Sequence, residues 1–454
     1  MDDMQDIFDY IDANADEYIA DLQTLVQQPS ISAQNIGLEE CADIVLNMMH
    51  KDGLDAHSHE LEGGPPVITG HMTTSKSEKT MLCYSHYDVQ PPEPLDAWTH
   101  DGPWSAKIVD GVMYGRGCSD NKSGILAFNK AAKAFMQVRG ELPVNLKFII
   151  EGEEEIGSVH LGPWVEKNTA LLEADGMHCL DGPVDSSTDL PDIDLGLKSV
   201  LFAEFVVKGA NADIHSLNFP LLPSPIWDLV RMLNSLMDEN RHILVEGWYD
   251  GLYKLLEEDD EIMADKLSRI DLDDMKREWG IEQFALGRDG LDALKARAYE
   301  PTANIAGIVG GYTGAGSKTI VPNEARAKMD FRLPPHLDPQ AAMEKLRKHL
   351  DKHGFEHIEI NFEASAEPPY KISVKEPMAQ AIIKAATKLY GQAPIVNGVS
   401  AEGTILKHVW IPCVLTGFAS AGANLHAPDE NIRIGHYIQG IKYAAQIMEE
   451  FGQS

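Results

Sequence analysis

Basic residues are scarce in this sequence of 454 residues, which holds 38 Lys and Arg against 71 Asp and Glu, for a formal net charge of −33. Nucleic-acid binding needs a basic face that displaces counterions from phosphates, and anionic membranes likewise attract basic segments. The charge balance therefore argues against both kinds of partner. A negative excess of this size keeps a protein soluble but indicates no particular fold.

Cysteine is also sparse, and the five residues lie far apart with no Cys-x-x-Cys pair. This argues against a disulfide framework or a thiolate zinc site and favours buried thiols in a reducing compartment. The longest uncharged stretch, 409–428, contains proline and glycine and does not fit a membrane helix. The acidic start has no Lys or Arg before Lys51, unlike a secretory leader, so we expect a cytoplasmic protein.

Several common catalytic signatures are missing. The sequence has no His-Glu-x-x-His motif and no Gly-x-Ser-x-Gly elbow, so hydrolysis by a serine nucleophile is disfavoured. The segment GYTGAGSKT (311–319) is superficially like a phosphate-binding loop, but Ser317 separates the Gly and Lys that such a loop needs side by side. We therefore do not expect a nucleotide-triphosphate site.

The length predicts two to three domains at about 150 residues each. Segments 1–196 and 374–454 alternate apolar strands with amphipathic helices, which is typical of an α/β sheet with largely parallel strands. Segment 197–373 instead has strands of alternating polarity around a highly charged helical region. We predict a mixed-sheet α/β catalytic domain, formed by 1–196 and 374–454, with an inserted α+β domain at 197–373.

Apolar periodicity places the individual elements. Predicted helices cover 5–26, 38–51, 338–353, 376–390 and 436–450, with a helical region at 226–300. Predicted strands cover 81–89, 111–117, 144–150, 176–180, 199–209, 324–333, 357–364 and 411–416.

Acidic and imidazole side chains gather where the strands of the α/β domain end. They are His86, Asp88, Asp120, Glu153, Glu154, Glu155, Asp181 and His426. Sites in open α/β sheets lie outside the carboxyl ends of the strands, and carboxylates placed together repel one another unless a cation lies between them. Because few Lys or Arg residues are near, we infer a pair of divalent metal ions. Oxygen and imidazole ligands suit Zn²⁺, Mn²⁺ or Co²⁺.

Each of these residues has a simpler interpretation when it is taken alone. His86 fits a hydrogen-bonded core histidine, 153–155 a solvated acidic loop, Asp120 a helix N-cap and Asp181 a turn residue. The set favours a metal site, because independent accidents would not place all of them at strand ends. The two-residue spacing of His86 and Asp88 also lets the carboxylate accept the ring N–H.

Five ordered segments resemble the motifs of the aminoacylase/carnosinase-type co-catalytic metallopeptidases. The segments are SHYDVQP (85–91), GRGCSDNKSG (115–124), EGEEEIGS (151–158), CLDGP (179–183) and LHAPDE (425–430). The family includes cytosolic dipeptidases, acetylornithine deacetylase, succinyl-diaminopimelate desuccinylase and glutamate carboxypeptidases, and this chain is most similar to the dipeptidase (carnosinase-like) branch. The resemblance covers nearly the whole chain and implies a phosphorylase/hydrolase-like catalytic domain with an inserted lid and dimerisation domain.

Carried over residue by residue, the resemblance implies two metal ions per subunit, Zn²⁺ before Mn²⁺ or Co²⁺. The implied ligands are His86 and Asp181 in one site, Glu155 and His426 in the other, and Asp120 bridging both. Glu154 is implied as the general base, and Asp88 orients His86. Glu153 stands at a variable position of the family and is expected to be structural.

The inserted domain carries the implied substrate contacts. His215 matches the lid histidine, an oxyanion-stabilising donor that reaches the partner protomer's site in dimeric members, although Leu217 stands where the family usually has glycine. Arg332 matches the residue that grips a substrate carboxylate, and Thr319 and Thr404 match further contacts. The simpler interpretations are a loop histidine for His215 and a surface salt bridge for Arg332.

These observations predict metal-dependent hydrolysis of dipeptides or related small amino-acid amides by an activated water, in a homodimer without nucleic-acid or membrane partners. Two alternatives remain. One is an N-acyl amino acid deacylase or carboxypeptidase of the same family, and the other is a catalytically inactive relative that only binds.

Overall fold

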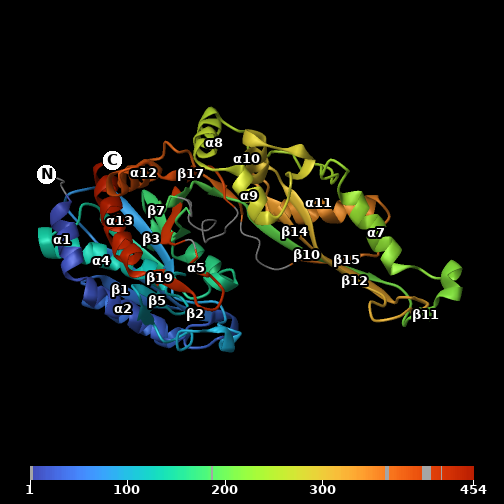
Figure 1. The fold of residues 1–454 in the computed structure, drawn as a ribbon, viewed down its shortest axis with the longest axis horizontal. Coiled ribbons are helices and arrows are strands. Elements are labelled where there is room, and N and C mark those ends of the chain that lie inside the picture. The colour runs from blue at the N-terminus through green and yellow to red at the C-terminus, as the bar shows by residue number, and fades with distance from the viewer. Residues whose placement is uncertain (1–3, 186–187, 363–367, 401–410, 421) are drawn as a thin grey trace. The chain divides into compact units, whose positions relative to one another are not determined.

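The chain forms two compact units in the computed structural model (Figure 1). The structure describes residues 4–185, 188–362, 368–400, 411–420 and 422–454. Unit 1 takes the described residues of 1–195, 372–397 and 404–454, and unit 2 takes those of 196–371 and 398–403.

Unit 1 is built on an eight-stranded mixed sheet in the order β1-β2-β6-β3-β7-β18-β8-β17. Its strands are β1 (Asp55–Leu61), β2 (Gly64–Met72), β3 (Thr80–His86), β6 (Asn145–Glu151), β7 (Gly176–Pro183), β8 (Asp192–Asp194), β17 (Ile395–Asn397) and β18 (Cys413–Ala419). The neighbouring strands β6, β3, β7 and β18 run parallel. Their carboxyl ends therefore reach one edge of the sheet.

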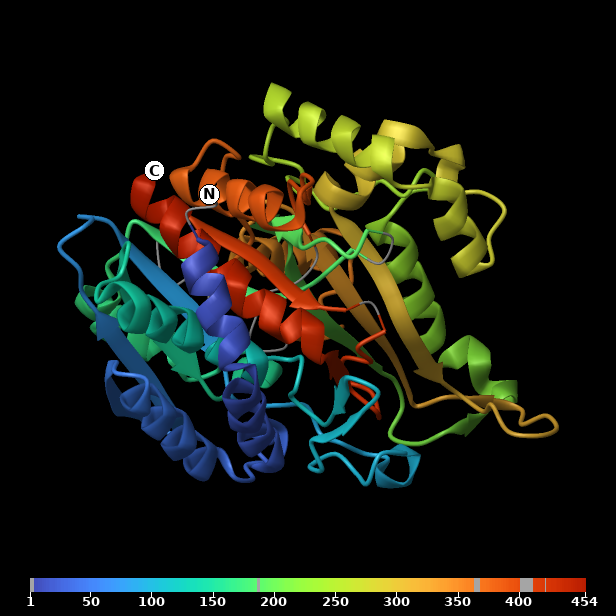
Figure 2. The same ribbon diagram turned by 60° about the vertical axis from the view of Figure 1, so that its left-hand side comes forward.

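Helices from both ends of the chain pack in unit 1, where α1 lies beside α13 and both contact α4 (Figure 2). The helices are α1 (Gln5–Ala13), α2 (Ala15–Gln27), α3 (Leu38–Lys51), α4 (Lys122–Arg139), α5 (Leu161–Lys167), α6 (Thr169–Leu172), α12 (Pro377–Tyr390) and α13 (Ile434–Gln453). The short helix η3 (Glu154–Ile156) follows β6. None of the described helices combines the length and the apolar character that a bilayer crossing demands.

The sequence-based elements of unit 1 need four corrections. The predicted strand 81–89 ends at His86 as β3, so Asp88 follows the strand and does not lie on it. The predicted helix 5–26 is two helices, because Asn14 leaves the helical conformation with φ −109° and ψ 11°. The predicted strand 111–117 is only β5 (Val112–Tyr114), which pairs with β4 (Lys107–Val109) and β19 (Asn431–Arg433) outside the main sheet. The hairpin β1-β2 was not predicted, because β1 is largely exposed and lacks an apolar face that alternates.

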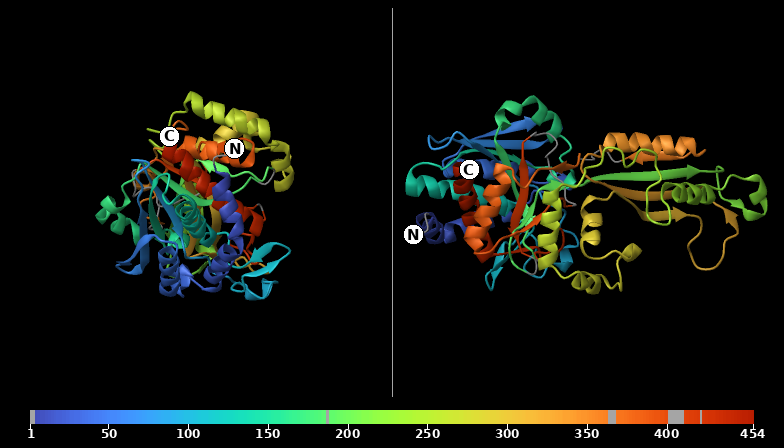
Figure 3. Two further views of the ribbon diagram at one scale, coloured as in Figure 1. Left: turned by 90° about the vertical axis from the view of Figure 1, so that its left-hand side faces the viewer. Right: turned by 90° about the horizontal axis from the view of Figure 1, so that it is seen from above.

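Unit 2 contains a four-stranded antiparallel sheet in the order β12-β14-β10-β15. Its strands are β10 (Ser199–Lys208), β12 (Thr302–Gly310), β14 (Glu324–Leu333) and β15 (Glu359–Phe362). Alternate residues of β10 and β14 are buried against α7 (Pro225–Leu236) and α11 (Pro339–Lys352), and the right-hand view of Figure 3 shows α11 along one side of this sheet. The alternation in the sequence thus marks one buried face.

The charged region of unit 2 forms a separate small helical cluster. Its helices are α8 (Glu257–Arg269), α9 (Leu272–Trp279) and α10 (Gly290–Tyr299), and they pack around Met263, Leu272 and Leu294. Two short ladders complete the unit: β11 (Ile214–His215) with β13 (Ile320–Val321), and β9 (Gly196–Leu197) with β16 (Tyr370–Lys371). The predicted fold class, a mixed α/β sheet with an inserted α+β domain, is confirmed.

Candidate metal centre

Four neighbouring parallel strands deliver the predicted residues to one edge of the sheet in unit 1. His86 is the last residue of β3, and Asp181 lies near the end of β7 beside it. Glu154 and Glu155 follow β6 on the other side of β3, and His426 follows β18. Because the strand order is β6-β3-β7-β18, loops that are distant in the sequence meet at this edge.

The first cluster consists of His86, Asp120 and Asp181. The Nε2 atom of His86 lies 3.2 Å from Oδ1 of Asp120 and 3.4 Å from Oδ2 of Asp181. His86 is fully buried, and its Nε2 makes no hydrogen bond with any described residue. A buried nitrogen that has carboxylate neighbours but no hydrogen bond is costly, so this atom points to a ligand between the three side chains.

The second cluster consists of Asp120, Glu155 and His426. The Nε2 atom of His426 lies 3.0 Å from Oδ2 of Asp120 and 3.3 Å from Oε2 of Glu155. Asp120 therefore turns one carboxylate oxygen toward each cluster. Two adjacent triads that share a carboxylate have the arrangement that a bridged pair of cations requires.

The electrostatics of the site also favour bound cations. Burial, assisted by Asp120 and Glu155, raises the pKa of Asp181 to about 6, although His86 lowers it. Burial likewise raises the pKa of Glu154 well above its usual range, and the neighbouring carboxylates raise it further. Cations between these carboxylates would restore their charged forms.

The chemistry of the donors fits this interpretation. The two clusters offer three carboxylates and two imidazoles and include no cysteine. Such oxygen and nitrogen donors suit Zn²⁺, Mn²⁺ and Co²⁺. The described residues thus provide a candidate site for two divalent ions and leave the choice among these metals open.

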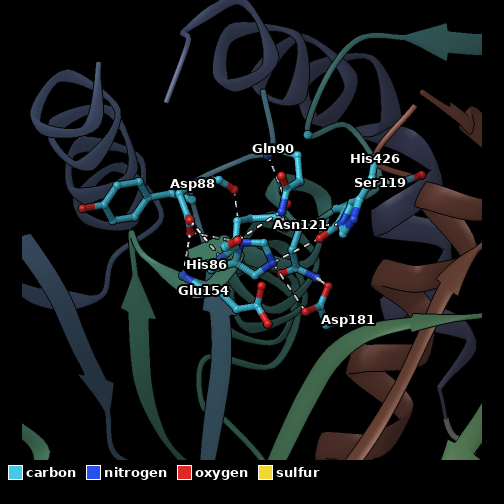
Figure 4. Close-up of polar contacts among 12 residues, drawn as sticks. His86, Asp88, Gln90, Ser119, Asn121, Glu154, Asp181 and His426 are labelled. Atoms are coloured by element: carbon cyan, nitrogen blue, oxygen red, sulfur yellow. Dashed lines mark hydrogen bonds and ion pairs between the residues drawn. The ribbon is translucent and has the colours of Figure 1, made fainter. Parts of the chain in front are cut away.

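Asp88 supports both the histidine and the acidic turn (Figure 4). Its Oδ1 lies 3.3 Å from Nδ1 of His86. The same carboxylate accepts the backbone N–H groups of Glu154 and Glu155, each at 3.1 Å. The hydrogen bond of His86 Nδ1 joins the backbone carbonyl oxygen of Asp88, at 3.1 Å. Asp88 therefore orients His86 through its main chain as well as its carboxylate, and the carboxylate also fixes the start of η3 at Glu154.

Two amides that sequence reasoning did not assign hold carboxylates of the site. The Nε2 group of Gln90 donates to Oε2 of Glu155 at 2.9 Å, and the Nδ2 group of Asn121 donates to Oδ1 of Asp181 at 2.6 Å. Both stand close in the chain to predicted site residues, Gln90 two positions after Asp88. This closeness in the sequence is the signal that could have identified the two amides. It does not predict which carboxylate each amide binds.

The predicted substrate contacts belong to unit 2, as far as they are described. His215 ends β11, is exposed, and accepts the backbone N–H of Leu217 on its Nδ1 at 3.1 Å. The carbonyl oxygen of Thr319 accepts the N–H of the residue after His215 at 3.0 Å, so these two positions are neighbours. Arg332 lies on β14, opposite the edge strand β12. Thr404 lies outside the described residues.

Comparisons with known proteins give a consistent result. The model of peptidase family M20/M25/M40 matches residues 82–450. The chain is 30% identical to the human Beta-Ala-His dipeptidase over 99% of this chain and 93% of that protein. It is 28% identical to the Cys-Gly metallodipeptidase dug1 of Schizosaccharomyces pombe over 98% and 97%, respectively. It also resembles the solved structure of an M20 family metallo-carboxypeptidase, Sso-CP2 from Sulfolobus solfataricus, with a TM-score of 0.87 and 36% identity. The match covers 96% of this chain and 100% of that one.

Proposed function

The chain belongs to peptidase family M20/M25/M40, and from this we propose that it hydrolyses the amide bond of dipeptides or related small amino-acid amides. One observation carries the proposal: two ligand triads share Asp120 and lie beside the carboxylate of Glu154. The dipeptidases among its relatives support the substrate class.

The proposed ligands divide into His86 with Asp181 and Glu155 with His426, and Asp120 belongs to both sets. Two divalent ions held there would supply Lewis acidity and lower the pKa of a water molecule toward neutrality. We propose Zn²⁺ first, with Mn²⁺ and Co²⁺ as alternatives, since this donor set accepts all three.

Glu154 is the proposed general base. Its carboxylate takes a proton from the attacking water and then passes this proton to the leaving amine. The N–H of Glu154 is held by Asp88, which keeps the turn in place. Burial raises the pKa of Glu154, so the residue can hold the proton between its uptake from the water and its delivery to the leaving amine.

The inserted domain, predicted at 197–373 and largely the same as unit 2, is proposed to recognise the substrate and to act as the lid and dimerisation domain. Arg332 would bind a free carboxylate through its planar guanidinium fork, and His215 would donate to the developing oxyanion. Thr319 of the same domain would add a hydroxyl contact, and Thr404, which belongs to the C-terminal segment of the chain, would add another. A free carboxylate held in this way would limit the part of the substrate beyond the scissile bond to a short C-terminal piece.

A carboxypeptidase or N-acyl amino acid deacylase is the second candidate. It is favoured by the solved M20 family metallo-carboxypeptidase, which is 36% identical to this chain. The two activities differ in the group on the amino side of the scissile bond. A dipeptidase takes a free amine there, whereas the alternative enzymes take a blocked one.

Hydrolysis assays on chelator-treated protein with Zn²⁺, Mn²⁺ or Co²⁺ added back separately test this proposal. We expect β-Ala-His and Cys-Gly to be cleaved with kcat/KM at least about 10-fold higher than N-acetyl or N-succinyl amino acids and N-blocked dipeptides. A dipeptidase that binds the free ammonium group of its substrate would leave its own polar groups unpaired when that group is blocked. Faster cleavage of the blocked substrates would favour the second candidate. No cleavage of any amide by the metal-loaded protein would indicate an inactive relative.

We also propose a homodimer formed through unit 2, in which His215 reaches the partner's site. The outer edge strand β12 exposes Ile305, Ile308 and Val309, the last of them by 71%. An apolar edge strand of this kind readily pairs with another chain. Light scattering is expected to give twice the chain mass of 50.0 kDa and a monomer for Ile308→Lys. A wild-type monomer would contradict the dimer.

A cytoplasmic location is proposed from cysteine chemistry. Cys41, Cys83, Cys118 and Cys179 are free thiols, and all five cysteines are buried in the structure. Unpaired thiols of this kind are typical of a reducing compartment.

A further inference from the structure

Glu430 is a fully buried carboxylate that binds the loop carrying Asp120. Its four hydrogen-bond donors are the guanidinium of Arg116 at 2.8 Å and the backbone N–H groups of Gly117, Ser119 and Asp120 at 2.9, 3.0 and 3.1 Å. Glu430 lies only four positions after His426 in the chain. A single side chain thus connects two candidate metal ligands that are 306 residues apart.

Backbone contacts reinforce this connection. The carbonyl oxygen of Glu430 accepts the N–H of Gly115 at 2.9 Å, and that of Asn431 accepts the hydroxyl of Ser119 at 2.8 Å. The next residues form β19, which pairs with β5 in antiparallel register. The segments before Asp120 and after His426 therefore form one hydrogen-bonded body.

The loop that presents His426 needs such an anchor, because its backbone is strained. Asn424, His426 and Asp429 have φ values of 53°, 59° and 59°, in the left-handed region that side chains other than glycine rarely adopt. Such conformations persist only where surrounding contacts hold them. Asp429 is bound by the N–H and hydroxyl of Thr99 at 2.8 and 2.7 Å, and Glu430 follows it directly.

The pair of Glu430 and Arg116 is poorly explained by stability alone. Both side chains are buried, and removing two charges from water costs about as much as their attraction returns. What the pair provides is geometry, since it places the N–H groups of Gly117, Ser119 and Asp120 on one carboxylate. The first cluster depends less on loops, because His86 and Asp181 lie within strands of the central sheet.

We propose that Glu430, together with Arg116, is a positioning residue that sets Asp120 against His426 and thereby determines the affinity of the second cluster for its ion. This inference rests on the proposed metal centre. Glu430 itself is not a ligand, since its two carboxylate oxygens are occupied by the four donors.

Zinc titrations of chelator-treated protein, followed by calorimetry, test the proposal. Glu430→Gln keeps the size of the side chain but replaces one acceptor oxygen with an N–H₂ group. We expect one of the two zinc ions to bind about 10- to 100-fold more weakly, while the other changes by less than about 3-fold. Excess zinc should restore kcat, because the ligands and the base are intact.

Asp52→Asn is the matched control. Asp52 is a buried carboxylate of unit 1 that pairs with Lys130 at 2.6 Å and Lys133 at 3.3 Å, and no described contact joins it to the site. We expect a similar fall in the thermal midpoint of metal-free protein but wild-type zinc affinities. Loss of zinc affinity in Asp52→Asn as well would show that general destabilisation suffices and would overturn the proposal.

A double variant, Arg116→Gln with Glu430→Gln, separates geometry from charge. In Glu430→Gln an unpaired Arg116 cation is left near the metal site, and repulsion alone could weaken zinc binding. If positioning is responsible, the double variant should bind zinc as weakly as Glu430→Gln does. Recovery of the wild-type zinc affinity in the double variant would contradict a positioning role. If the single variant Glu430→Gln binds both zinc ions with the affinities of the wild type, the positioning role is refuted. If the wild-type protein binds no zinc, the proposed metal centre itself is refuted.

Discussion

Glu154→Gln is expected to lower kcat by about 10²- to 10⁴-fold while both metal ions remain bound, because general-base catalysis contributes on that scale. Glutamine has nearly the same shape but cannot accept the proton of the attacking water. Glu154 belongs to neither ligand triad, so metal content should stay at the wild-type level. Metal analysis and steady-state kinetics on the same preparation measure both quantities.

Glu153→Gln is the control for this change. Glu153 is the neighbouring residue of the same acidic block, but its carboxylate accepts the backbone N–H and the ring Nδ1–H of His160 at 3.0 and 2.8 Å. We expect turnover within about 3-fold of wild type, since this residue lies outside the reacting groups. Near-wild-type turnover in Glu154→Gln would show that the base has been assigned wrongly.

The pH dependence follows from the same assignment. Only unprotonated Glu154 can accept a proton, so kcat/KM falls as the pH drops through the pKa of this group. Burial raises that pKa above the usual range of a glutamate, and bound cations lower it again. Steady-state kinetics over a range of pH test this assignment. The fall of kcat/KM at acidic pH that the wild type shows should be absent from the residual activity of Glu154→Gln.

Asp120→Ala is expected to abolish turnover, by more than about 10⁴-fold, because both ions lose a ligand at once. Its two oxygens face different clusters, at 3.2 Å from His86 and 3.0 Å from His426. In this variant no carboxylate would be shared by the two ions. We expect metal content after dialysis to fall below that of any other single ligand variant.

Asp181→Ala and His426→Ala make the comparison specific, since each removes a ligand from only one cluster. Each should lose one ion at limiting metal and keep the other. Asp96→Ala, at an exposed position of unit 1, should bind two ions as wild type does. Retention of both ions by Asp120→Ala would refute a bridging role.

Much of the fold was predictable because burial imposes regular patterns on the chain. The predicted helix 38–51 coincides with α3, and the predicted strand 324–333 coincides with β14, since each has one continuous apolar face. Periodicity did not predict the elements whose bounds and partners depend on tertiary contacts. The break at Asn14 divides a continuous amphipathic pattern. Strand β5 lies outside the main sheet because its partners are β4 and β19, and β19 is more than 300 residues away in the sequence.

The sequence by itself determined which chemistry is available: the His, Asp and Glu residues at strand ends, the absence of thiolate motifs and the overall negative charge. Only the tertiary structure decided how these groups are arranged, with Asp120 facing two clusters and Gln90, Asn121 and Glu430 each bound to a particular partner. The reason is physical. Residue type and periodicity report local burial, whereas hydrogen bonds between distant loops depend on strand order, which brings the carboxyl ends of β6, β3, β7 and β18 to a common edge.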